Sequence, residues 1–275
     1  MIYIPTLKPL IENGNSIYTE ITYEKRFTKV DDVTHDEEHI HDFYEIYINL
    51  SGDVSFLVED NIYPISRGDI IVSAPNEIHR CIYHSDCVHE HFCIWIREIP
   101  FATAHLKKQF DKNKLLVLPE EEKERVINAC FGFYKSRISG GSPFGAVKNF
   151  FEILDITSAE KHGTTEAESL PQSFSKIVEY ISNHYTEASC TVTLLCDVFY
   201  ISKSTLCRRF RNHFQTTPSD YIESKRFSEA KKLLSTGQSV QNACFNSGFS
   251  DCSYFIMRFR KKFGITPYKY QKEFV

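Results

Sequence analysis

The 275-residue sequence predicts an α+β protein of two domains, a jelly-roll β-barrel with helices followed by an all-α domain. Three observations lead to this fold class. Residues 39–96 contain short β-rich runs with a turn signal about every eight to twelve residues, which is typical of a barrel or sandwich. From residue 120 onward, apolar residues recur at helical spacing. Residues 163–172 are small and polar and contain a proline, as expected of a linker.

Short turns separate the strands of the predicted barrel. The runs between the turn signals predict strands at 39–50, 54–58, 62–65 and 70–72. Two helices follow, at 120–138 and 143–161, so the first domain extends over residues 1–162. The N-terminal segment Met1–Glu24 either folds over a bound ligand or forms the first strand, and its residues favour neither.

Four side chains of the predicted barrel suit a binding site. His39, His41 and Glu45 are separated by two and four residues, which in a strand puts all three on one face. His79 can approach from a neighbouring strand. Three imidazoles and one carboxylate suit zinc, iron, manganese or nickel. Alternatively, the same groups line a small-molecule pocket or hydrogen-bond one another without a metal.

The spacing of these residues resembles that of the cupin barrel. The pattern H-x-H-x3-E-x6-G ends here at Gly52, and residues 68–79 resemble the second cupin motif. In metal-binding cupins the residues that match His39, His41, Glu45 and His79 hold a divalent ion. The second motif departs from the pattern, since it is shorter and lacks the glycine that follows its proline.

Further candidate ligand-binding residues extend this cluster. Tyr47 belongs to the predicted pocket, and Trp95 is either a stacking surface for a ligand or a core residue. A second group has ligand types that suit zinc, at a spacing that matches no familiar zinc module. Its histidines alternate, which also fits a partly solvated face of an acidic barrel. This group comprises Cys81, His84, Cys87, His89, His91 and Cys93.

The two parts of the chain carry opposite charge. Residues 172–275 contain 15 Lys and Arg against 8 Asp and Glu, a formal charge of +7, whereas residues 1–171 carry −11. A basic part joined to an acidic one favours nucleic acid as the partner of the basic part.

The basic part repeats one helical pattern twice. A short helix at 193–199 precedes a basic helix that Ser202 caps, and a short helix at 240–246 precedes a basic helix capped by Ser250 or Asp251. A short helix, a tight turn and a basic helix predict a helix-turn-helix unit. Further helices open with Thr217-Pro218, running to about Leu234, and with Thr266-Pro267.

Residues 174–274 resemble the DNA-binding domain of AraC-type transcription regulators, which has two helix-turn-helix units joined by a long helix. The most specific match is the pattern G-F-S-D-x2-Y-F-x3-F-R-K-x-F-G-x-T-P-x2-Y, which runs from Gly248 to Tyr270. The barrel and linker resemble the sensing half of the same family. We therefore expect a DNA-binding domain at residues 173–275 and a cupin-like ligand-sensing and dimerisation domain at 1–162.

The resemblance assigns base-facing positions to Ser204, Cys207 and Arg208 in the first unit and to Cys252, Ser253, Ile256 and Met257 in the second. Arg208 is the candidate for bidentate guanine recognition. The family often has Ser-Arg where this chain has Ile256-Met257, so we expect the first unit to carry more specificity. The whole predicted set is Lys203, Ser204, Thr205, Cys207, Arg208, Arg211, Cys252, Ser253, Ile256, Met257, Arg258 and Arg260.

These features predict a ligand-responsive transcription regulator rather than an enzyme. The resemblance implies promoter DNA, a small-molecule effector such as a sugar, and a homodimer through the helices at 120–161; RNA polymerase is a further candidate partner. Two alternatives stay open: a metal-dependent cupin enzyme, and a regulator whose effector is a divalent metal ion.

The cellular location follows from three absences in the sequence. Residues 1–5 lack the pattern of a secretory signal, and no uncharged apolar stretch approaches the roughly 18 residues of a membrane span. Nine cysteines without a C-x-x-C pair predict reduced thiols. We expect a cytoplasmic protein.

Overall fold

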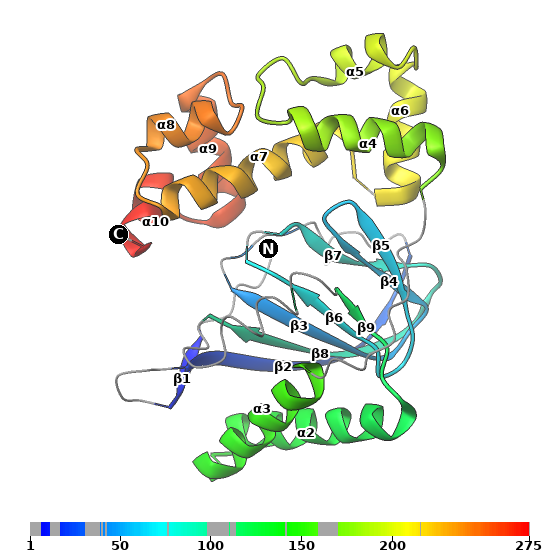
Figure 1. Cartoon of the computed structure of the whole chain (residues 1–275), viewed down its shortest axis with the longest axis vertical. Coiled ribbons are helices and arrows are strands. Elements are labelled where there is room, and N and C mark those ends of the chain that lie inside the picture. The colour runs from blue at the N-terminus through cyan, green and yellow to red at the C-terminus, as the bar shows by residue number, and fades with distance from the viewer. Residues whose placement is uncertain are drawn as a thin grey trace. The chain divides into compact units, whose positions relative to one another are not determined.

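The computed structural model describes residues 7–11, 17–30, 39, 41, 43–75, 77–97, 110, 114–140, 142–158, 170–214 and 216–274. The chain divides into two compact units, Met1–Glu168 and Ser169–Val275, each containing the elements labelled in Figure 1. The division falls inside the predicted linker at 163–172. Residues 163–169 of that linker lie outside the described part, and Gln172 already begins a helix.

Two antiparallel sheets form the first unit. Both are antiparallel throughout, as in a jelly-roll barrel. The larger sheet has the strand order β1 (Lys8–Ile11), β2 (Ile17–Thr28), β8 (Cys87–Ile96), β3 (Tyr44–Ser51), β6 (Ile70–Ser73) and β9 (Leu115–Leu116). The smaller sheet has the order β5 (Asn61–Ile65), β4 (Val54–Val58) and β7 (His79–Tyr83).

The alternation of side chains along β3 separates two cores. Ile46 and Ile48 pack in the cluster that also contains residues of the helices, whereas Tyr47 packs in the cluster that contains Phe56 of the smaller sheet. Because successive side chains of a strand point to opposite faces, Glu45 and Asn49 share the interior face with Tyr47. The polar groups of the barrel are therefore enclosed between the sheets.

Two helices cover the outer face of the larger sheet. Helix α2 (Glu120–Ile138) and helix α3 (Pro143–Ser158) pack against each other and against β2 and β8, as Figure 1 shows. The bounds of α2 agree with the prediction, and residues 159–161 of the second predicted helix lie outside the described part. The described parts of the N-terminal segment form β1 and the start of β2, so they are strands of the sheet.

The second unit is entirely helical in its described part. Short polar side chains cap the N-termini of four of its helices. In each case the side chain accepts a hydrogen bond from the backbone N–H three residues later, and the capping residues are Thr191, Thr217, Ser239 and Asp251. Of the two candidate caps, Asp251 therefore holds the position. The helices are α4 (Gln172–His184), α5 (Val192–Val198), α6 (Lys203–Phe214), α7 (Pro218–Ser235), α8 (Val240–Asn246), α9 (Cys252–Phe263) and α10 (Pro267–Phe274).

The long helix α7 ties the two helix-turn-helix units together. Its Arg226 donates to the carbonyls of Tyr185, Glu187 and Cys190 at 2.8–2.9 Å, in the segment that leads into α5. The turn between α8 and α9 packs against the same segment, because a Cβ on Gly248 would lie 2.5 Å from the Tyr185 carbonyl oxygen. Gly248 also has φ +93°, which favours glycine.

In the described part of the chain, none of the helices is both long enough and apolar enough to cross a membrane.

Candidate functional site

The interior of the barrel gathers a cluster of three histidines and one glutamate, which we call the His-Glu cluster: His39, His41, Glu45 and His79. Each offers one ligand atom, and these atoms all lie within 4.8 Å of one another. Glu45 comes from β3 and His79 from β7, while His39 forms an isolated β-bridge with His79. All but His39 are buried, so the structure brings together the four residues that the sequence analysis selected.

The imidazoles of the cluster are oriented by backbone carbonyls. His41 Nδ1 lies 2.9 Å from the Phe43 carbonyl oxygen, and His79 Nδ1 lies 2.9 Å from that of Glu77. A carbonyl only accepts, so each Nδ1 is the donor and Nε2 faces the cluster. Both Nε2 atoms approach the same oxygen, Glu45 Oε2, at 3.1 Å and 3.6 Å.

The charges of the cluster oppose the cost of burial. Burial alone would raise the pKa of the Glu45 carboxyl, but His79 and His41 together hold that pKa well below its usual range. Burial would likewise lower the pKa of His79, but the Glu45 carboxylate raises it. The cluster therefore favours a carboxylate at Glu45 together with positive charge on the imidazole side.

Trp95 and Tyr47, the two further predicted pocket residues, belong to different polar groups of the interior. Trp95 Nε1 donates to Glu45 Oε2 at 2.6 Å, so Trp95 joins the His-Glu cluster directly. Tyr47 faces the same interior, but its hydroxyl lies 2.6 Å from His89 Nε2 and belongs to a second polar group. Both side chains are buried.

The second polar group holds neutral histidines. His89 bonds to the hydroxyls of Tyr47 and Tyr83, and its ring stacks on His91 with centroids 4.5 Å apart. Burial lowers the pKa of His89 to about 3 and that of His91 to about 4, with Arg26 adding to both shifts. These two side chains are 1% and 8% exposed, so the expectation of a partly solvated histidine face is wrong.

The predicted zinc alternative for residues 81–93 does not gather into one site. In the described part of the chain, the His-Glu cluster is the group of three or more possible ligands that comes together. His84, for example, bonds to Ser55 Oγ at 2.8 Å. Asn49 and Tyr83 were not among the predicted site residues, although the period of two that selected Glu45 also places Asn49 on the interior face.

Helices α6 and α9 present the predicted DNA-facing residues. Leu206 and Phe210 are fully buried on one face of α6, and Phe255 and Phe259 are fully buried on the matching face of α9. The opposite faces are therefore open. Lys203, Ser204, Arg208, Arg211, Ser253, Ile256, Met257 and Arg260 are exposed, whereas Thr205, Cys207, Cys252 and Arg258 are partly buried.

Arg258 forms an ion pair that the sequence analysis did not predict. Its guanidinium binds both carboxylate oxygens of Glu223 on α7, with Nε 3.0 Å from Oε1, and Tyr254 donates to the same carboxylate. This ion pair raises the pKa of Arg258 and fixes its side chain toward α7. The sequence did not indicate the pair, because Glu223 lies 35 positions away. Arg258, predicted as one of the DNA-binding residues, is thus engaged in an ion pair within the helical unit.

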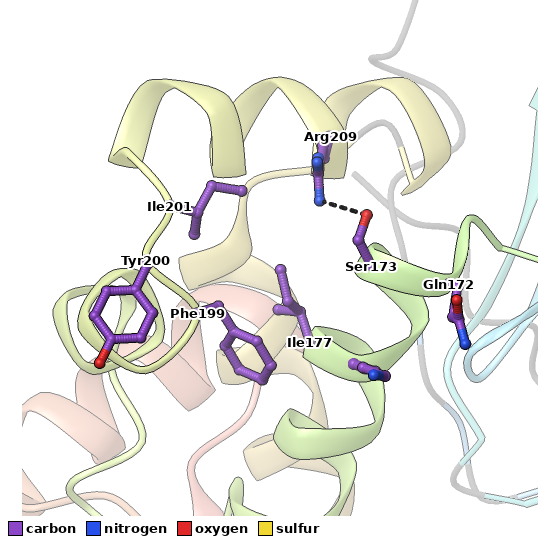
Figure 2. A pocket seen from close by; sticks show the side chains of 8 residues that line it. Gln172, Ser173, Ile177, Phe199, Tyr200, Ile201 and Arg209 are labelled. Atoms are coloured by element: carbon purple, nitrogen blue, oxygen red, sulfur yellow. Dashed lines mark hydrogen bonds between the residues drawn. The ribbon is translucent and has the colours of Figure 1, made fainter.

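A surface hollow of about 380 Å³ lies within the helical unit, between α4 and the turn from α5 to α6. Figure 2 shows Arg209 of α6 reaching Ser173 of α4, with Nη1 3.2 Å from Oγ. Arg209 is thereby held on the side of α4. Among the described residues Arg208 has no ion-pair partner, which leaves it available on the exposed face of α6.

Comparisons with known proteins match both units. The model of an AraC-like ligand binding domain matches residues 26–132, and the model of a helix-turn-helix domain matches residues 195–273. Strands β3 to β9 fall within the first range, which also includes the end of β2 and most of α2, and both helix-turn-helix units overlap the second.

Curated relatives align along most of the chain. The HTH-type transcriptional regulator YdeO of Shigella flexneri is 38% identical over 239 residues, which cover 83% of this chain and 90% of the relative. The regulator YbfI of Bacillus subtilis is 26% identical, covering 78% and 80%, and the activator RhaS of Escherichia fergusonii is 25% identical, covering 84% and 85%. The chain belongs to the AraC-type family of transcription regulators, with an AraC-like ligand-binding domain before a helix-turn-helix domain.

Proposed function

We propose that the chain is a sequence-specific DNA-binding regulator whose barrel binds an effector. The observation that carries this proposal is the pair of helices α6 and α9, each with buried rings on one face and exposed polar and basic side chains on the other. Recognition helices of helix-turn-helix proteins enter the major groove with such a face toward the bases.

We assign base reading chiefly to α6. Arg208 is exposed and matches a base-facing position, and a guanidinium forms two hydrogen bonds with guanine. On α9 the exposed side chains at the matching positions are Ile256 and Met257, which suit thymine methyl groups. Arg211 and Arg260 are exposed, and we assign them contacts with phosphates that would give a salt-dependent affinity.

We assign effector binding to the polar interior of the barrel. The hydrogen-bonding side chains of that interior, such as Tyr47, Glu45 and Trp95, suit an organic molecule such as a sugar. Homodimer formation through α2 and α3 is supported by exposed apolar side chains, since Phe144 is 84% and Ile138 is 62% exposed. The effector acts if it binds two arrangements of the dimer with different affinity.

The test uses operator sequences selected from a random DNA pool by the full chain. Arg208→Ala should weaken binding to the selected operator about 5- to 150-fold and relax the preference at one base pair. The matched control is Arg209→Ala, on the same helix but held by Ser173, which should keep the preference. The assignment fails if Arg208→Ala keeps the preference while Ser253→Ala and Met257→Ala abolish it.

A further inference from the structure

We propose that the barrel holds one divalent transition-metal ion on His39, His41, Glu45 and His79. The inference deepens the proposed function, because the ion would lie in the domain to which we assign effector binding. Whether the ion binds does not depend on DNA recognition, so the two claims are tested separately.

The orientation of the imidazoles is the first argument. Both His41 and His79 donate from Nδ1 to carbonyl oxygens, so in their neutral forms both Nε2 lone pairs face Glu45 Oε2. A lone pair that faces a carboxylate at this distance is repelled unless a cation lies between them. A proton or a metal ion is therefore required at the centre of the cluster.

The geometry around His79 favours the metal ion over a proton. A proton shared by His41 and Glu45, whose atoms are 3.1 Å apart, serves that pair alone. His79 is 0% exposed and its Nε2 has no hydrogen-bond partner, since 3.6 Å from Glu45 Oε2 is too long. A metal ion at the centre satisfies all four ligand atoms at once, as a single proton does not.

The donor set also indicates which metals fit. Bonds of about 2.1 Å place the donors of one ion roughly 3–4 Å apart, and the cluster spans at most 4.8 Å before any ion has drawn it together. Three imidazoles and one carboxylate favour Zn²⁺, Co²⁺ or Ni²⁺ over Mg²⁺ and Ca²⁺, which prefer oxygen ligands.

The fluorescence of Trp95 can report binding of the ion. Trp95 is the single tryptophan, and its Nε1 lies 2.6 Å from the Glu45 oxygen that faces both Nε2 atoms. Co²⁺ and Ni²⁺ have partly filled d shells and quench a nearby indole, whereas Zn²⁺, with a filled shell, does so much less. Trp95 fluorescence therefore reports occupation of this site rather than binding elsewhere.

The experiment uses the full chain stripped with a chelator and reloaded with Co²⁺, Ni²⁺, Zn²⁺ or Mg²⁺. We expect one ion of Co²⁺, Ni²⁺ or Zn²⁺ per chain by mass spectrometry of the metal, and Mg²⁺ not retained. Co²⁺ should quench Trp95, and its absorption should show d–d bands without thiolate charge transfer, which excludes Cys81 and Cys93 as ligands.

Variants separate the cluster from other sites. His79→Gln and Glu45→Gln should lower Co²⁺ affinity at least tenfold, whereas His84→Gln, a barrel histidine outside the cluster, should not. Circular dichroism checks that each variant folds, and His41→Gln replaces any variant that does not. The proposal is overturned if no ion is retained, if the folded cluster variants keep wild-type affinity, or if thiolate bands appear. Operator binding by the stripped chain separately tests the regulator itself.

Discussion

In the helical unit many of the side chains buried around α7 are aromatic rings, whereas between the two sheets of the barrel the buried side chains include a carboxylate, an amide and several imidazoles. The Phe227 ring has Phe249, Phe259 and Phe263 within 6 Å between centroids. In the barrel, Glu45 and Asn49 are 3% and 1% exposed and belong to an interior that also buries histidines.

The two units therefore differ in where their candidate functional side chains lie, on the surface of one and in the interior of the other. Apolar interiors stabilise a fold, and the helical unit places its exposed polar groups on the outer faces of α6 and α9. Buried polar groups cost free energy unless they are satisfied, so a protein retains them where a ligand needs them. We therefore expect a mutation in the aromatic interior to act through lost packing, and acid to act on the stability of the polar interior.

The largest effect is expected in the aromatic interior. Phe259→Ala should lower the free energy of unfolding of the helical unit by about 3–5 kcal/mol, because it opens a cavity among packed rings. Tyr268→Ala, at a 61% exposed position, is the control and should change it by less than about 0.5 kcal/mol. Hydrogen exchange in α7 peptides measures both variants, and a loss below 1 kcal/mol for Phe259→Ala would contradict the comparison.

Acid should act on the polar interior. The folded pKa values of His89 and His91, about 3 and about 4, lie below the ordinary value of 6.5, so below pH 6.5 the unfolded chain binds more protons. Between pH 7 and pH 5 each histidine should therefore cost the barrel about 2 kcal/mol of stability. Urea unfolding followed by Trp95 fluorescence at several pH values measures the loss.

The control for this pH effect is a double variant. His89→Gln with His91→Gln should flatten the profile between pH 7 and pH 5. The raised pKa of His79 contributes in the opposite direction, since its share of stability is present at low pH and is lost as pH rises through the folded pKa. An unchanged slope in the double variant would show that His89 and His91 are not buried in neutral form.

The ion pair Arg258–Glu223 is a polar contact of the helical unit, and its role can be tested as structural or DNA-binding. Arg258→Ala should destabilise that unit by about 1–2 kcal/mol, since it leaves a mostly buried carboxylate without its bidentate partner. Operator preference should stay as in the wild type. A double-mutant cycle with Glu223→Gln measures the coupling, and a shift in preference instead would show that Arg258 contacts DNA.

The two units also differ in how far the sequence predicts them. Helix 240–246 and the caps at Thr217 and Asp251 follow from local signals, which lie within a few residues of the feature they determine. The barrel depends on contacts between distant residues. The spacing of His39, His41 and Glu45 correctly predicted that these side chains come together. The predicted strand at 39–50 was wrong in its first part, because β3 begins at Tyr44 and His39 pairs with His79 in an isolated bridge.

The sequence does not show which face of each strand points into the barrel. Alternation places His89 and His91 together but does not say whether that face is solvated, and the structure shows it buried. The pairing of Arg258 with Glu223 joins two helices whose packing is not a local property of either. The hydrogen bond from Trp95 to Glu45 likewise crosses two paired strands.

The smallest effect is expected at the surface, where the two turns of the helix-turn-helix units can be compared. Tyr200 occupies the place that Gly248 has in the second unit, and both have positive φ, 48° and 93°. Gly248 has no room for a side chain, whereas Tyr200 is 95% exposed. Tyr200→Gly relieves the left-handed conformation but adds chain entropy to the unfolded state, and these terms nearly cancel. Stability should change by less than about 1 kcal/mol in chemical unfolding. A larger loss would mean that the exposed turn, and not only the aromatic interior, stabilises the helical unit.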